Sequence, residues 1–467
     1  MAIIAETAFA TISELGAGLR GGAFTSIELT QFFLKRLDRL GPRFNAVVRV
    51  THQTALDQAA KADRELAAGR DRGPLHGIPF GVKDLLATKG VPTSWGAAPL
   101  KEQMIDVDAT VIVRLREAGA VLAAKLAMVE LAGGFGYRQA NAAFTGPGLN
   151  PWNEKHWSGG SSSGPGSAVG AGLVPFAIGS ETWGSIMSPS GNCGITGLRP
   201  TYGRVSRHGA MALSWTMDKL GPMCRSAEDC GVVLDAVAGP DEHDPSAVDR
   251  AFEFPPRQPF AAPFKFATLK GATDHVQPAI ARNYRHSLQV LADLGTFEEI
   301  ELPDLPYGTV AATMISCEMA AAFDAFINSG DVWELTAEED RFGGFANQAI
   351  PAKDYINAMR IRAKIQRVLD DLLSRHDAIV TPALATIAKP VDRPFRESFP
   401  GFYGTAIGGA GNAAGVPAIC VPNGFGEQGL PTSLQFVARA FDDAKLLAIA
   451  QAYQSRTAWH RKHPVLG

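Results

Sequence analysis

The chain has 467 residues, of which 46% are hydrophobic and 19% are charged, and its formal net charge at pH 7 is -3. This composition supplies enough apolar residues for a large buried core and too little charge for a disordered chain. Because basic residues are not in excess and no long run of like charges occurs, nucleic-acid binding is not expected.

Cysteine usage and the N-terminus predict an intracellular protein. The five cysteines form no CxxC pair, and an odd number in a long chain does not suggest a disulfide framework, so we expect a reducing, cytoplasmic location. The first residues include Glu6 and Glu14 and lack a basic region followed by an apolar run, so no secretion signal is expected. The longest uncharged stretches, 157–180 and 402–425, are rich in Gly, Ser, Asn and Pro, which predicts buried core segments and no membrane span.

Residues 1–70 are predicted to form a helical N-terminal lead-in. Thr25 and Glu28 have capping-box spacing before the amphipathic run LTQFFLKRLDRL, and THQTALDQAAKADRELAAG repeats apolar residues at helical spacing. The apolar stretch GIPFGV at 77–82 is then predicted as a strand that ends next to Lys83.

Strand and helix are predicted to alternate through the remainder of the chain. Helices are expected at 109–120, 281–295 and 405–415, and strands at 121–127, 264–271, 378–384, 417–423 and 433–438. Residues 71–467 are therefore expected to form one α/β domain, in which helices flank a large mixed sheet.

Two segments depart from this alternation. Residues 239–263, rich in Asp and Pro, predict a surface excursion. Residues 305–355 are the least patterned part of the chain and are expected to carry substrate-facing variation.

The most unusual segment, residues 159–201, is dominated by small residues, which implies close backbone packing and a functional site. Its GxSxG pattern at 160–164 would suit a hydrolase elbow, but that requires a preceding strand, and NPWNEKHWSG is predicted to be a polar loop. A phosphate or dinucleotide loop is disfavoured because neither GK[ST] nor GxGxxG after a strand occurs.

Three motifs in this segment, GGSSSGPGSA, GSETWGS and CGITGLRPT, resemble those of the amidase signature family. GIPFGVKD upstream resembles the family's lysine motif, and PAICVPNGF and GLPTSLQFVA resemble its closing strands. The resemblance implies a mixed sheet of about eleven strands flanked by helices. It also implies a catalytic triad, which by motif position consists of Lys83 as base, Ser161 in a cis peptide after Gly160, and Ser185 as nucleophile.

The chemistry of these residue types agrees with those roles. A serine hydroxyl attacks a carbonyl only as a base removes its proton, and a lysine can be that base only when it is neutral. The apolar strand before Lys83 would favour the neutral amine, and Ser161 would relay the proton from Ser185 to Lys83 and later to the leaving nitrogen. Candidate oxyanion-hole donors are the backbone N–H groups of Thr182, Trp183, Gly184 and Ser185.

Departures from the family pattern bear on the substrate. Trp183 replaces a glycine common in relatives, and Ile186 and Met187 stand where many relatives carry an arginine, which removes one anchor for a substrate carboxylate. We therefore expect a neutral, apolar or aryl amide, with carbamate (urethanase) or ester cleavage as side activities. The milder replacements, Ser163 for Gly and Glu181 for Asp, predict no specific effect. The expected substrate-binding residues are Phe135 (in LAGGFGY, by resemblance), Ser161, Trp183 and Met187.

Several alternatives stay open. Residues 155–246 are especially similar to the glutaminase subunit of the tRNA-dependent amidotransferase, in which the same triad would release ammonia inside a complex. A catalytically silent binding scaffold is a second alternative, disfavoured because all three triad residues are present. No histidine falls in a metal-ligand pattern, so neither a metal nor a cofactor is expected, and Cys193 is predicted to be a buried filler. The expected partner is a small amide-type substrate, and the chain could form a homo-oligomer.

Overall fold

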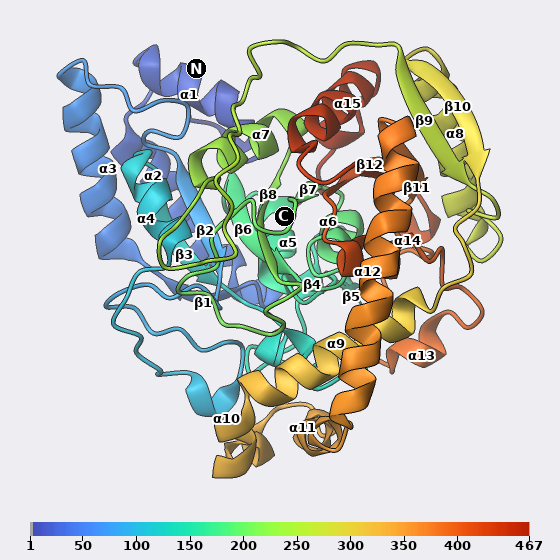
Figure 1. The fold of residues 1–467 in the computed structure, drawn as a ribbon. Coiled ribbons are helices and arrows are strands. Elements are labelled where there is room, and N and C mark those ends of the chain that lie inside the picture. Colours follow the sequence, from blue (N-terminus) through green and yellow to red (C-terminus); the bar gives the residue numbers. More distant parts are fainter. Residues whose placement is uncertain (1–2, 467) are drawn as a thin grey trace.

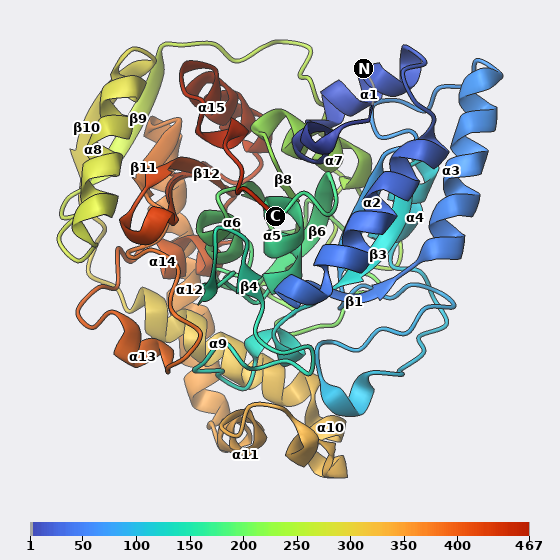
Figure 2. The same ribbon diagram turned by 180° about the vertical axis from the view of Figure 1, so that it is seen from behind.

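The computed structural model describes residues 3–466. They form one large mixed sheet with helices packed around it (Figures 1 and 2). The sheet has 11 strands in the order β1-β3-β2-β6-β8-β7-β12-β13-β11-β9-β10, and β4 and β5 form a separate two-stranded sheet. This confirms the predicted α/β class and the strand number expected from the resemblance.

The strands are β1 (Val47–Val50), β2 (Pro79–Lys83), β3 (Val121–Leu126), β4 (Leu149–Asn150), β5 (Asn153–Trp157), β6 (Phe176–Glu181), β7 (Thr196–Arg199), β8 (Lys219–Cys224), β9 (Phe264–Leu269), β10 (Gly295–Ile300), β11 (Ala378–Pro382), β12 (Ala418–Phe425) and β13 (Pro431–Val437).

The α-helices are α1 (Ile12–Arg20), α2 (Ser26–Leu40), α3 (His52–Ala67), α4 (Thr110–Glu117), α5 (Ser163–Gly170), α6 (Met187–Cys193), α7 (Ala227–Val237), α8 (Pro278–Ala292), α9 (Tyr307–Ala322), α10 (Asp324–Ser329), α11 (Asp340–Gln348), α12 (Ala352–Arg375), α13 (Phe395–Ser398), α14 (Ile407–Ala414) and α15 (Asp443–Arg456).

The first 70 residues are mostly helical and include one edge strand. The predicted capping box is present at α2, where Thr25 accepts from the N–H of Glu28 and the Glu28 side chain accepts from the N–H of Thr25. Strand β1 pairs antiparallel with β3, so this region also contributes to the main sheet. The division into a lead-in and a main domain at residue 70 stays a prediction.

The middle of the sheet is buried on both faces. Every residue of β2, β3 and β6 is buried, as expected for neighbouring parallel strands that have helices over both faces. Both views show α1–α4 at one end of the sheet, α8 beside β9 and β10 at the other, and α9–α11 gathered below it (Figures 1 and 2). Most buried apolar side chains belong to one core cluster.

One sequence prediction was wrong, and one weakly patterned segment is helical. Residues 153–157, expected in a polar loop, form β5, which pairs with β4, because Trp157 and His156 are buried while the residues before them stay at the surface. Residues 305–355, the least patterned part of the sequence, form α9, α10, α11 and the start of α12, and their substrate-facing variation stays a prediction. Helix α9 is apolar around most of its circumference, since it packs between α12, α14 and α11, and this obscures the amphipathic period.

The uncharged stretches and the Pro-rich excursion behave largely as predicted. Residues 157–180 are buried throughout, and 407–424 are mostly buried, whereas 402–403 are exposed. Residues 239–263 contain no helix or strand. Within residues 3–466 no helix is both long enough and apolar enough to cross a membrane.

Candidate active site

The topology brings Lys83 and the turn that carries Ser185 to the same edge of the sheet. Strands β2 and β6 are parallel neighbours, and the carboxyl ends of parallel strands meet at one edge. Lys83 is the last residue of β2, and Ser185 lies in the turn that follows β6. The Lys83 side chain is fully buried.

A chain of hydrogen bonds joins the three residues predicted as the triad. The Lys83 amine lies 2.8 Å from the Ser161 hydroxyl, and the Ser161 hydroxyl lies 2.9 Å from that of Ser185. Lys83 also donates to the Ser180 hydroxyl of β6 over 2.8 Å. The Gly160–Ser161 peptide is cis, as the resemblance implied. The structure thus brings Lys83, Ser161 and Ser185 together in the order that proton transfer requires.

The turn from Thr182 to Ser185 has free N–H groups beside the Ser185 hydroxyl. Gly184 adopts φ = +83°, a conformation that favours glycine. Among residues 3–466, no acceptor pairs with the N–H groups of Trp183, Gly184 or Ser185. Such groups can stabilise the negative oxygen that develops when a carbonyl is attacked.

Buried charges hold this turn at both ends. The Glu181 carboxylate accepts the N–H groups of Ile186 (2.8 Å) and Met187 (3.0 Å) and pairs with Arg199 at 2.9 Å. Burial alone would raise the pKa of Glu181, but the charges of Arg199 and Lys219 and the two N–H donors outweigh it and lower this pKa to about 2. Glu181 is therefore an anion whose charge is met by Arg199 of β7.

Asp218 supports the turn from the other side. Its carboxylate accepts from the Thr182 hydroxyl (2.5 Å) and from the N–H groups of Leu213 (2.8 Å) and Ser214 (2.9 Å). Burial raises the pKa of Asp218, while these three donors favour the carboxylate form.

The same burial tunes Lys83. Removal from water lowers the pKa of Lys83 from 10.5 to about 7, although the negative charges of Asp218 and Glu181 oppose the shift. A substantial fraction of Lys83 is therefore neutral near pH 7, as a proton acceptor must be.

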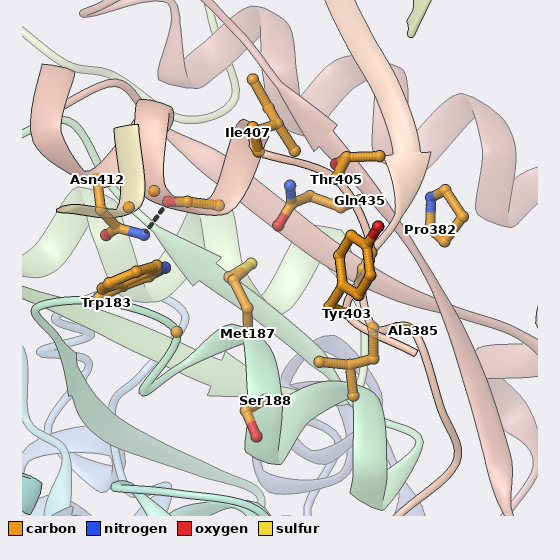
Figure 3. Close-up of a pocket in the computed structure, with 18 of the residues that line it drawn as sticks. Trp183, Met187, Ser188, Pro382, Ala385, Tyr403, Thr405, Ile407, Asn412 and Gln435 are labelled. Atoms are coloured by element: carbon orange, nitrogen blue, oxygen red, sulfur yellow. Dashed lines mark hydrogen bonds between the residues drawn. The ribbon is translucent and has the colours of Figure 1, made fainter. Parts of the chain in front are cut away.

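Two cavities flank the turn. The first, of about 290 Å³, is lined by Trp183, Gly184 and Met187 and is called here the Trp183 cavity (Figure 3). The second, of about 500 Å³, is lined by Ser180, Thr182 and Asp218 and is called the Asp218 cavity. Only the second is lined by a residue in hydrogen-bond contact with Lys83.

Comparison with known proteins identifies the family. Residues 28–447 match the family model described as Amidase. The chain belongs to the amidase signature family. It is 36% identical to a glutamyl-tRNA(Gln) amidotransferase subunit from Methylococcus capsulatus, over 97% of this chain and 98% of the relative, and 34% identical to the corresponding subunit from Chloroflexus aggregans, over 99% of each.

A solved structure agrees with this assignment. The native peptide amidase of Stenotrophomonas maltophilia superposes with a TM-score of 0.83 at 30% identity, over 96% of this chain and 97% of that one. Family membership over nearly the whole chain makes the protein an enzyme of the amidase type, a hydrolase.

The other residues predicted from the amidase signature motifs lie in different surroundings. Trp183 and Met187 line the Trp183 cavity, and the Trp183 side chain is 41% exposed. Phe135 is only 5% exposed, packs on Phe323 of the α9–α10 junction, and lines neither cavity; its role as a substrate contact stays a prediction. Cys193 is buried and donates to the Ser158 carbonyl, so it behaves as the predicted filler.

Sequence reasoning missed several polar residues of this amidase site. Ser180 could have been found, because it lies in the GSETWGS motif close to the nucleophile. Asp218 and Gln435 had no such local signal, since each reaches the site only through pairing of strands distant in the sequence.

Proposed function

We propose that this protein hydrolyses the carbon-nitrogen acyl bond of neutral, apolar or aryl amides, with Ser185 as nucleophile, Ser161 as relay and Lys83 as base. The observation that carries the proposal is the continuous hydrogen-bonded chain from Lys83 through Ser161 to Ser185, at 2.8 Å and 2.9 Å, beside unpaired N–H groups of the turn. An activated nucleophile next to oxyanion donors is the arrangement that acyl transfer requires.

The proposed reaction runs in two halves. The Ser185 oxygen bonds to the substrate carbonyl carbon while its proton passes to Ser161 and the Ser161 proton passes to Lys83. The carbonyl oxygen becomes negative and is stabilised by the N–H groups of Trp183, Gly184 and Ser185. The carbon-nitrogen bond then breaks, the relay returns a proton to the departing nitrogen, and water releases the acyl group from Ser185 by the reverse path.

The position of the relay orients the substrate. The departing nitrogen must receive its proton from Ser161, and Lys83 and Ser180 connect that relay to the Asp218 cavity. The Trp183 cavity contains no residue of the relay but includes Gly184 of the turn. We therefore assign the acyl group to the Trp183 cavity and the amine to the Asp218 cavity, which is large enough for an aryl amine.

The absence of free charge favours a neutral acyl group. The two ionised side chains that line the Trp183 cavity, Glu181 and Arg199, are paired with each other. The other lining side chains are uncharged, and many of them are apolar, including Trp183, Met187, Pro382, Leu384 and Ile407. Binding a carboxylate here would remove its hydration without a free cation to replace it. Esters and carbamates of the same shape are expected as side substrates, because the acyl-enzyme step is shared.

The test is hydrolysis of benzanilide, a phenyl carbamate, phenyl benzoate and free glutamine by the purified chain, with Ser185→Ala in parallel. Turnover of benzanilide that disappears in Ser185→Ala is the expected result. Turnover of glutamine without turnover of the three other compounds would contradict the proposal.

A second candidate is the glutaminase subunit of a tRNA-dependent amidotransferase. It is favoured by the 34–36% identity to such subunits over almost the full length of both chains. Met187 and the internally paired Arg199 argue against it, since glutamine carries two charged groups. Glutamine turnover that appears only after partner subunits are added would establish it. Cytoplasmic location and self-association stay predictions from the sequence.

A further inference from the structure

The wall of the Trp183 cavity contains one polar side chain that stands apart from the others. Gln435 belongs to β13, where its backbone is paired with Cys420 of β12 on one side and Thr381 of β11 on the other. This central position fixes the side chain, which is 5% exposed and lines the cavity. Figure 3 shows its amide end among Trp183, Met187, Tyr403 and Ile407, directed into the space they enclose.

The hydrogen-bond capacity of this amide is unused within the described chain. A side-chain amide offers two donors and one acceptor, and the Gln435 amide atoms are not among the buried unpaired polar atoms of residues 3–466, so they face the cavity space. No side-chain or backbone group of residues 3–466 pairs with the Gln435 amide, and Figure 3 shows no bond from it to its neighbours. Its atoms are therefore available to a molecule bound in the cavity.

Two other buried polar side chains of the lining, Asn412 and Arg199, are different, because they are already paired. Asn412 accepts from Lys219 at 3.0 Å and donates to the Gly408 carbonyl at 2.9 Å (Figure 3). Arg199 donates to Glu181 and to the Val416 carbonyl. Of the three most deeply buried nitrogen-bearing side chains that line this cavity, only Gln435 has an amide left for a ligand.

The shape of the cavity restricts that ligand further. The Trp183 ring lies beside α9 and α14, where a Cβ atom at Gly308 or Gly408 would come within 3.5 Å of it. The partly exposed indole thus presents a flat apolar surface, which suits a planar group. Because Gln435 is uncharged, its counterpart is a neutral hydrogen-bonding group.

We propose that the Trp183 cavity binds planar acyl groups that carry an uncharged hydrogen-bonding substituent, and that Gln435 is the specificity-determining residue that recognises this substituent. The inference rests on the proposed function for the placement of the acyl group. It goes further by naming what that group carries and which residue selects it.

The test compares two probes of similar size and shape, 4-acetylbenzamide and 4-isopropenylbenzamide, of which only the first has a ketone oxygen as acceptor. Their dissociation constants are measured by calorimetry on the Ser185→Ala background, alone and combined with Gln435→Met or Gln435→Glu. A methionine has no hydrogen-bond donor, and an ionised glutamate carboxylate only accepts, so neither replacement donates to the ketone oxygen. If one variant does not fold, the other still tests the proposal. Gln454→Met is the matched control, because Gln454 of α15 is also buried, does not line the cavity, and is paired with Ala227 of α7 and Thr196 of β7.

The quantity that decides is the ratio of the two dissociation constants. We expect Gln435→Met and Gln435→Glu to weaken binding of the ketone relative to the hydrocarbon probe by roughly three- to tenfold. Gln454→Met should leave the ratio unchanged. An unchanged ratio in the Gln435 variants, or no binding of either probe, would overturn the inference. If wild-type protein hydrolyses neither benzamide while the ratio still depends on Gln435, the proposed function fails and the binding site stands.

Discussion

The burial of Lys83 leads to a quantitative prediction for the pH dependence of catalysis. Its pKa of about 7 places the change from ammonium to neutral amine in the middle of the accessible pH range. Only the neutral form can accept the Ser185 proton, so kcat/KM for a neutral amide should rise about tenfold per pH unit below pH 7 and level off above it. A lysine at its ordinary pKa would instead give a rise that continues to about pH 10.

Asp218→Asn tests the assignment of this pH dependence to Lys83. The Asp218 carboxylate favours the ammonium form, so its removal lowers the pKa of Lys83 and moves the rising limb to lower pH by about one unit. The assay is kcat/KM for benzanilide from pH 5 to 9, with melting temperature recorded for each variant. Asp229→Asn is the control, because Asp229 is also buried but caps Ile12 at α1, away from Lys83. The reasoning is refuted if the wild-type profile is flat from pH 6 to 8, if Asp218→Asn leaves the midpoint in place, or if Asp229→Asn moves the midpoint as far as Asp218→Asn does.

Three other substitutions have distinct expected effects. Ser161→Ala should lower kcat by about 10² to 10⁴ with little change in melting temperature, because it breaks the relay and leaves Lys83 bonded to Ser180. Arg199→Met should lower the free energy of unfolding by about 3–5 kcal/mol in urea titrations, because Glu181 is left as an unpaired buried charge, and an effect below 1 kcal/mol would contradict the pairing. Trp183→Gly should raise kcat/KM for a branched acyl group such as pivaloyl by about tenfold relative to benzoyl, and an unchanged ratio would remove Trp183 from the acyl wall.

The sequence was sufficient for those parts of the fold that have local signals. The capping box at Thr25 and the apolar run before Lys83 each depend on residues adjacent in the chain, and both were predicted correctly. Strand β1 was missed, because four residues between two strong helices have no alternation long enough to recognise. The strand number was implied only by the family resemblance, and the strand order was not predicted, since the pairing of β12 with β7 joins segments more than two hundred residues apart.

The candidate site divides in the same way. Lys83, Ser161 and Ser185 each lie in a motif, so the motifs alone are enough to name them, and the hydrogen bonds among them connect residues brought together by β2, β6 and the loop that precedes α5. Residues that set the electrostatics have no motif of their own. Asp218 directly precedes β8 and belongs to no recognisable motif. Its effect on the pKa of Lys83 becomes apparent only when β8 is placed beside β6.

The position of Glu181 helps to explain why Met187 can stand where many relatives carry an arginine. The Glu181 carboxylate holds the N–H groups at the start of α6 and is fully buried, so a cation nearby is needed for its stability. Arg199 supplies that cation from β7, with its other donors committed to the Val416 carbonyl. The charge that stabilises the turn is thereby kept away from the ligand, and Met187 adds an apolar wall instead. In a cavity with no free ion, discrimination among acyl groups must come from shape and neutral hydrogen bonds, and these are the contributions of Trp183 and Gln435.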